Sequence, residues 1–188
     1  MLLILFLSIF FANTFAQVPV YQAPNFHQLV DFNKSAYAGK WYTISRIPNF
    51  IEYNDICSAI ALEYNEPLGT YTMILNAVNP STKLLRNSIA ALFPKEHEHS
   101  SFTFRYPIKP PVNLGVMTVL ATDYKHWGVK AGVINFHKFW LTFAWIDSRE
   151  PTISPEHYEE ACQVLRANNI PVSSMMKVEQ SCSNIVNA

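Results

Sequence analysis

Residues 39–42 read Gly-Lys-Trp-Tyr and open a long region, residues 39–147, that reads as a series of short strands. The chain has 12 prolines but only 5 glycines, and 14% of its residues are aromatic, which is typical of strands joined by proline-containing loops. The expected strands lie at residues 40–47, 57–65, 70–77, 84–92, 101–106, 116–124, 129–134 and 138–146. Eight strands with short connections form a meander, and a meander removes its exposed edges by closing into a barrel.

One helix is expected after the last strand. Residues 154–156, Ser-Pro-Glu, provide an N-cap, a proline at the first helical position and an acid in the first turn. Apolar residues at i, i+3, i+4 and i+7 then form one stripe: Tyr158, Ala161, Cys162 and Leu165. Residues 168–171, Asn-Asn-Ile-Pro, end the helix. Because an eight-stranded barrel has no interior room for a helix, the stripe should pack on the outside.

The sequence therefore predicts an all-β protein, an eight-stranded up-and-down antiparallel barrel with one C-terminal α-helix packed outside. The 188 residues include 14 basic and 14 acidic side chains, so the formal net charge is zero. This balance argues against a nucleic-acid-binding protein and against a polybasic membrane-surface protein. A hydrophobic content of 49% excludes a disordered chain.

The N-terminus has the layout of a secretory signal peptide. Residues 1–16 contain no charged side chain, an apolar run reaches Phe11, and small residues at Thr14 and Ala16 suit cleavage after Ala16. Roughly 11 apolar residues are too few to cross a bilayer, which needs about 20. We therefore expect a secreted, extracellular protein with one domain at residues 17–188. Asn33-Lys34-Ser35 is an acceptor sequon, so Asn33 is a candidate glycosylation site.

Three cysteines are candidates for disulfide bonding in a secreted chain: Cys57, Cys162 and Cys182. Three thiols allow at most one internal bridge and leave one thiol over. Cys162 lies on the apolar stripe of the helix, where a buried free thiol is the simplest interpretation.

Three motifs, in order and at barrel spacing, resemble the signature of the secreted lipocalins. Gly39 and Trp41 begin the first strand, Thr122-Asp123-Tyr124 closes the sixth, and Arg149 follows the eighth. Within that family the chain is similar to the branch of apolipoprotein D and its insect lazarillo and bilin-binding relatives. Five segments carry this similarity: residues 31–34, 46–48, 121–124, 143–146 and 168–170.

The resemblance implies structural roles for these motifs. Trp41 would plug the closed end of the barrel, and Arg149 would stack on its indole while donating hydrogen bonds to backbone carbonyls. Asp123 suits a turn in which its carboxylate accepts backbone N–H groups. Relatives join the second strand to the C-terminal tail by a disulfide, which here implies a Cys57–Cys182 bridge.

The resemblance also implies a cavity for a small hydrophobic ligand of the fatty acid, sterol, retinoid or tetrapyrrole class. Alternation along the strands and the family pattern together place ten side chains inside: Tyr37, Ile60, Leu62, Phe102, Phe104, Met117, Val119, Leu141, Phe143 and Trp145. Residues 48–53 would cover the open end. Phe50 and Ile51, expected to be exposed there, would touch a membrane or lipoprotein during loading or would simply form a lid.

Other functions find less support in the sequence. No catalytic triad, phosphate loop or zinc motif is present, so neither an enzyme nor a cofactor is expected. His97 and His99 face one way but lack a third ligand in sequence, and no metal site is expected there. A secreted protein that acts mainly through its surface remains the alternative. The oligomeric state is left open.

Overall fold

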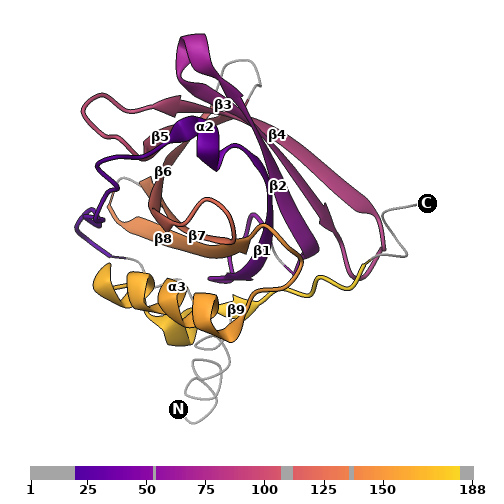
Figure 1. Ribbon diagram of the computed structural model, residues 1–188. Coiled ribbons are helices and arrows are strands. Elements are labelled where there is room, and N and C mark those ends of the chain that lie inside the picture. Colours follow the sequence, from indigo (N-terminus) through magenta and orange to yellow (C-terminus); the bar gives the residue numbers. More distant parts are fainter. Residues whose placement is uncertain (1–19, 53, 107–111, 136–137, 183–188) are drawn as a thin grey trace, which may run out of the picture.

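The computed structural model describes residues 20–52, 54–106, 112–135 and 138–182 (Figure 1). Within these residues eight main strands run in chain order: β1 (Gly39–Arg46), β2 (Ile56–Asn65), β3 (Thr70–Val78), β4 (Leu85–Pro94), β5 (Ser101–Tyr106), β6 (Val112–Thr122), β7 (Trp127–Asn135) and β8 (Trp140–Ser148). Each strand pairs antiparallel with the next, and β1 also pairs with β8, which closes the ring. The predicted up-and-down barrel is confirmed. The expected signal peptide, residues 1–16, lies outside the described residues.

The strand boundaries differ from the predicted ones by a few residues. The sixth strand was expected at residues 116–124, but β6 begins at Val112 and ends at Thr122. Its early end has a local cause, because Tyr124 has a φ angle of 66°, which belongs to the left-handed region and not to a strand. β8 was expected at residues 138–146 and instead spans Trp140–Ser148.

Several short elements were not predicted. They are α2 (Lys34–Tyr37), the 3₁₀ turns η1 (Glu66–Leu68) and η2 (Val172–Ser174), and β9 (Met176–Lys177). α2 follows an Asn33 N-cap whose side-chain oxygen accepts a hydrogen bond from the Ala36 amide at 3.0 Å. Elements of two to four residues have too little length for a hydrophobic period to reveal them.

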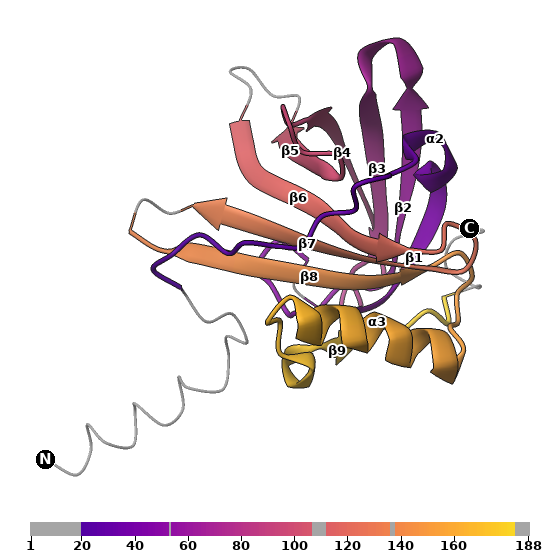
Figure 2. The ribbon, with the colours of Figure 1, turned by 60° about the vertical axis from the view of Figure 1, so that its left-hand side comes forward.

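The helix α3 (Pro155–Ala167) packs on the outside of the barrel, as Figure 2 shows. Its Ser154 N-cap accepts a hydrogen bond from the His157 amide at 3.2 Å. The buried residues Ala161, Cys162 and Leu165 pack against an apolar cluster on the outer faces of β6, β7 and β8. Cys162 is a free, buried thiol, and burial raises its pKa. No helix in the described part of the chain is long and apolar enough to span a membrane.

The C-terminal tail runs across the outside of β1 and β2. β9 pairs with the end of β1, and the Gln180 amide donates hydrogen bonds to the Thr43 and Ser58 carbonyls at 2.7 and 2.9 Å. A disulfide joins Cys57 on β2 to Cys182 in the tail, with 6.0 Å between their Cα atoms. This is the pair that the resemblance implied.

Candidate ligand-binding cavity

A cavity of about 90 Å³ lies inside the barrel. That is several times the roughly 10–15 Å³ that one water molecule requires, so the space suits part of an organic molecule. Five of the ten side chains predicted to point into the ligand space line it: Ile60, Phe104, Met117, Phe143 and Trp145. On β8, Phe143 and Trp145 stack with their ring centroids 6.0 Å apart, while Ala144 and Ile146 point outward toward α3. The predicted alternation of this strand is confirmed.

The other five predicted side chains do not line the cavity. Tyr37, Leu62, Phe102 and Val119 are buried in the cluster around Trp41, so they lie with the closed-end core. Leu62, Phe102 and Val119 point inward from their strands and Tyr37 from the end of α2, but at a height where core packing fills the barrel. Leu141 is half-buried at the start of β8, opposite Ile134.

Sequence reasoning missed several lining residues. The apolar and aromatic ones are Met73, Leu75, Tyr106, Val116, Val133 and Ile134. The alternation argument used for the eighth strand would have found Met73 and Leu75, which occupy alternate positions on β3. The polar ones are Thr43, Asn49, Glu52 and Lys130, and all four have apolar or aromatic neighbours in the sequence, where no pattern marks them.

Glu52 brings a carboxylate to the cavity wall. Its Oε2 atom accepts two hydrogen bonds, one from the Trp145 indole nitrogen at 2.7 Å and one from the Asn49 side-chain amide at 3.0 Å. Asn49 in turn accepts the backbone amides of Ile51 and Glu52 at 3.0 and 2.9 Å. These bonds fix the cavity tryptophan to the β1–β2 loop, so the loop and the aromatic wall form one unit.

Buried charges hold the same loop down. Arg46 is fully buried and donates through one guanidinium nitrogen to the carbonyls of Glu52 and Asp55, at 2.7 and 2.8 Å. Burial lowers the pKa of Arg46, and the neighbouring acids Glu52 and Asp55 oppose that shift. Arg86 on β4 forms an ion pair with Asp55 and donates to the Ile51 carbonyl at 2.7 Å. The loop expected to cover the open end is therefore anchored to two strands.

Phe50 and Ile51 at the tip of this loop differ in exposure. Phe50 is 54% exposed, and its ring meets Phe143 edge-on with 6.1 Å between centroids. Ile51 was expected to be exposed, but it is half-buried and lines the cavity. The apolar wall of the cavity takes up the Ile51 side chain, and only Phe50 is left at the surface. Tyr53, the last residue of the expected cover, lies outside the described residues.

An ion pair lies at one side of the cavity. Lys130 on β7 pairs with Asp147 on β8, and both side chains are at most 5% exposed. The Thr43 hydroxyl lies 3.2 Å from the second carboxylate oxygen and donates to it. Burial raises the pKa of Asp147, and the charge and hydrogen bond of Lys130 oppose that shift. Lys130 also lies over the Trp145 ring, 5.3 Å from its centroid.

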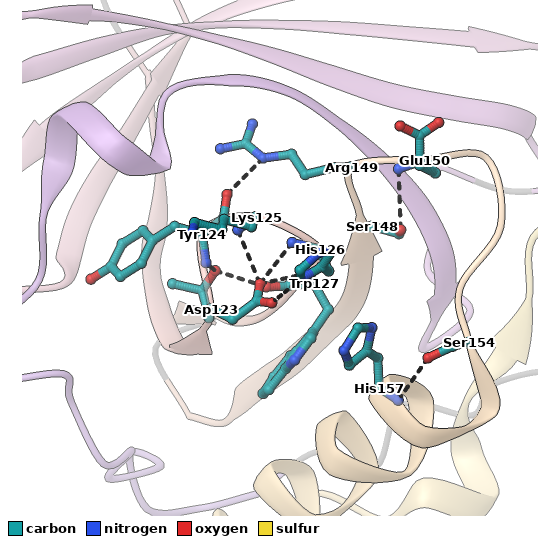
Figure 3. Close-up of polar contacts among 11 residues, drawn as sticks. Asp123, Tyr124, Lys125, His126, Trp127, Ser148, Arg149, Glu150, Ser154 and His157 are labelled. Carbon is teal, nitrogen blue, oxygen red and sulfur yellow. Dashed lines mark hydrogen bonds and ion pairs between the residues drawn. The ribbon is translucent and has the colours of Figure 1, made fainter.

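The three predicted motifs meet at the closed end. Trp41 is fully buried, and the Arg149 guanidinium lies 3.7 Å from the centroid of its indole ring. Arg149 donates to the carbonyls of Ala36, Lys40 and Tyr124 at 3.0, 2.9 and 3.0 Å; Figure 3 shows the bond to Tyr124. The stacking and the carbonyl bonds predicted for Arg149 are both present.

Gly39 and the Thr122-Asp123-Tyr124 motif complete this end. Gly39 has a φ angle of 95°, and a Cβ placed there would lie 3.2 Å from an Arg149 nitrogen, so a side chain would be both strained and crowded. The Thr122 hydroxyl donates to the Trp127 carbonyl at 2.8 Å and accepts the Tyr124 amide at 2.8 Å. These residues shape a turn and carry no reactive arrangement.

Residues 30–180 match the family described as "Lipocalin-like domain". The chain belongs to the lipocalin family. Lipocalins bind small hydrophobic ligands, and they are binding proteins rather than enzymes. The apolar cavity described above lies inside the barrel of this lipocalin, and Trp41 and Arg149 close one end of that barrel.

Sequence and structure comparisons agree. The lipocalin is 26% identical to mouse (Mus musculus) apolipoprotein D over 156 residues, covering 80% of this chain and 78% of the mouse protein. Insecticyanin from the tobacco hornworm Manduca sexta superposes with a TM-score of 0.73 at 22% identity, covering 87% and 88% of the two chains. Lobster apocrustacyanin A1 gives 0.69 at 16% identity, covering 87% and 93%. The resemblance to apolipoprotein D is confirmed, and the structural matches show the fold.

Proposed function

We propose that this lipocalin is a secreted carrier that binds one small hydrophobic ligand in its barrel cavity for transport or sequestration. The apolar cavity itself is the observation that supports the proposal most directly. Aromatic rings of Phe104, Phe143 and Trp145 line it together with aliphatic side chains from four strands. Burial of apolar ligand surface there would contribute roughly 25 cal/mol per Å² before ordering costs. We propose a ligand of the fatty acid, sterol, retinoid or tetrapyrrole class.

Two features support secretion. Residues 1–16 have the layout of a signal peptide, and a disulfide such as Cys57–Cys182 persists in oxidising compartments. Asn33 is exposed as the N-cap of α2, which leaves its side chain accessible to glycosylation. We propose it as a glycosylated position.

Ligand titration should quench the fluorescence of Trp145. A fatty acid, a retinoid or a bilin that enters the cavity comes into contact with its indole, whereas Trp127 lies outside the barrel wall beneath α3. We expect saturable quenching in the native protein, most of it lost in Trp145→Phe and retained in Trp127→Phe. Fluorescence titration of the three proteins with each ligand class measures this.

Either of two results would count against the carrier proposal. One is the absence of quenching with every apolar class; the other is equal quenching in the Trp145→Phe and native proteins. The first result would favour a lipocalin that acts mainly through its surface. Where saturable quenching is found, mass spectrometry of molecules that co-purify from the native source would identify the ligand directly.

We also propose that Phe50 contacts a membrane or lipoprotein during ligand loading. In Phe50→Ser, transfer of a fluorescent fatty acid from phospholipid vesicles should slow by roughly tenfold, or about 1.4 kcal/mol of the 1.5–3 kcal/mol that burying a Phe side chain contributes. Stopped-flow transfer kinetics measure this. Leu68→Ser is the matched control, because Leu68 is 67% exposed in the β2–β3 connection, away from the cavity-covering loop. Equal rates in native and Phe50→Ser proteins would refute the contact.

A further inference from the structure

Three side chains with metal-binding groups converge where the β6–β7 turn meets the first turn of α3. They are Asp123, His126 and His157, and one ligand atom from each lies within 4.8 Å of the others. Figure 3 shows the turn residues and His157 facing the same space from two elements. Within the described residues this is the one such group of three, and it does not include His97 or His99. It lies outside the barrel wall and contributes nothing to the ligand cavity.

The turn holds Asp123 in a fixed position, with one carboxylate oxygen directed at His126. One carboxylate oxygen accepts the backbone amides of Lys125, His126 and Trp127 at 3.1, 2.8 and 2.9 Å. The other oxygen takes part in none of these bonds and faces His126, 2.6 Å from its Nδ1 atom. Asp123 is thus a ligand with a fixed orientation.

The two imidazoles come from separate elements and lie side by side. Their ring centroids are 5.0 Å apart with an interplanar angle of 22°. The His157 backbone is fixed by its bond to the Ser154 N-cap, so its ring projects from a rigid helix start. The His126 side chain is 59% exposed, and its Nδ1 atom lies 2.6 Å from the Asp123 carboxylate. This contact and the stacking on His157 keep both imidazoles and the carboxylate beside one another.

We propose that Asp123, His126 and His157 form a binding site for a divalent transition-metal ion of the zinc type. Two imidazole nitrogens and one carboxylate oxygen are the ligands that zinc takes in open sites, with a further position left for water. Calcium and magnesium prefer oxygen ligands alone, so this set selects against them. The ion would join the β6–β7 turn to α3 and tie the outer helix to the barrel.

Glu160 lines the same surface hollow as Asp123, His126 and His157 and adds a second acid to it. It lies one helical turn after His157, where i and i+3 side chains share a face. The hollow thus offers two carboxylates to an approaching cation. Glu160 would act as a fourth ligand or as an acceptor for a metal-bound water.

Isothermal titration calorimetry of the untagged protein with ZnCl₂ tests the site. We expect one zinc per chain, with affinity roughly 10- to 100-fold lower in His126→Ala, His157→Ala and Asp123→Asn. The Asp123→Asn variant keeps a side-chain oxygen for the three backbone amides, so the turn should stay folded. The double variant His97→Ala/His99→Ala is the matched control and should bind zinc as tightly as the native protein.

Two independent readouts guard against loss of folding. Circular dichroism checks that each variant is folded. His126→Ala removes an exposed ring and keeps the bond from the backbone amide of residue 126 to Asp123, so this variant should have the native fold. With Cu²⁺ as a probe, the paramagnetic resonance spectrum should show nitrogen coupling that disappears in the His126→Ala/His157→Ala double variant. No zinc binding by the native protein, or unchanged affinity in the folded His126→Ala and His157→Ala variants, would overturn the proposal.

Discussion

Replacing Cys57 and Cys182 together by serine is expected to lower the free energy of unfolding by about 5 kcal/mol. The bridge joins residues 125 positions apart. The chain-entropy model credits the closing of so long a loop with about 4.9 kcal/mol, because the cross-link restricts the unfolded chain far more than the folded one. A typical domain has a total stability of about 5–15 kcal/mol, so this loss would remove about a third of it or more.

The folded state offers only local compensation for that loss. The tail keeps its hydrogen bonds without the bridge: the Cys57 amide donates to the Glu179 carbonyl at 2.6 Å, and the Val178 amide donates to the Ile44 carbonyl at 2.8 Å. These bonds hold a short tail against β1 and β2, but they do not restrict the unfolded chain. We therefore expect the variant to fold to the same structure with a much lower urea midpoint.

Urea unfolding followed by fluorescence, with and without dithiothreitol, measures the effect. Dithiothreitol should destabilise the native protein and the Cys162→Ala variant alike, because Cys162 is a free thiol that the reductant leaves unchanged. It should have no effect on the double serine variant. A native protein whose urea midpoint ignores dithiothreitol would show that the Cys57–Cys182 bridge contributes little.

The barrel was predictable from sequence because its signals are local and repeated. Eight strands, their turns and the capped helix each carry their own pattern, and an error at one boundary leaves the others intact. The error at the end of β6 comes from a single backbone angle, because the left-handed φ of Tyr124 ends this strand two residues earlier than expected. The roles of Trp41 and Arg149 were implied by the resemblance to the lipocalins, and the structure contains both the stacked pair and the bonds from Arg149 to backbone carbonyls.

The cavity was only half predictable, for a physical reason. Alternation gives the face of a strand on which a side chain lies, but not its height along the barrel axis. Phe102 and Phe104 share one face of β5, yet Phe102 lies in the core and Phe104 lines the cavity. Glu52 and Trp145 are bonded across 93 positions of sequence, and no local pattern reports such a pair. The convergence of Asp123 and His126 with His157 escaped the sequence for the same reason.

The buried charges around the cavity share one property: each has an opposite charge in contact with it or close by. Asp147 faces Lys130, Asp55 faces Arg86, and Glu52 lies near Arg46. Desolvation of a lone charge in such a place costs several kcal/mol, so a pair that loses one member destabilises the barrel. Replacing one member of a buried ion pair therefore lowers the free energy of unfolding far more than replacing both members.

Lys130→Met is accordingly expected to lower the free energy of unfolding by about 3–5 kcal/mol, because it leaves Asp147 buried without its cation. Lys130→Met combined with Asp147→Asn should recover most of that loss, since the introduced amide oxygen can still accept the Thr43 hydroxyl and no net charge remains. Urea unfolding of the three proteins at pH 7 measures the difference. The exposed pair Arg166–Glu159 provides the control, because Arg166→Met should leave the urea midpoint almost unchanged.

The pH dependence of stability distinguishes the unpaired Asp147 carboxylate from lost packing as the cause of the destabilisation. Burial raises the pKa of Asp147 above its unfolded value, and removing Lys130 takes away the partner that opposes the shift. A carboxyl with a raised pKa binds more protons in the folded state, so stability falls as the pH rises through the folded pKa and the penalty vanishes below the unfolded value of about 3.9. The deficit of Lys130→Met relative to the native protein should therefore be largest near pH 7 and shrink toward pH 4. A deficit that is constant over this range would mean that lost packing of the lysine stem, and not the unpaired carboxylate, destabilises the variant.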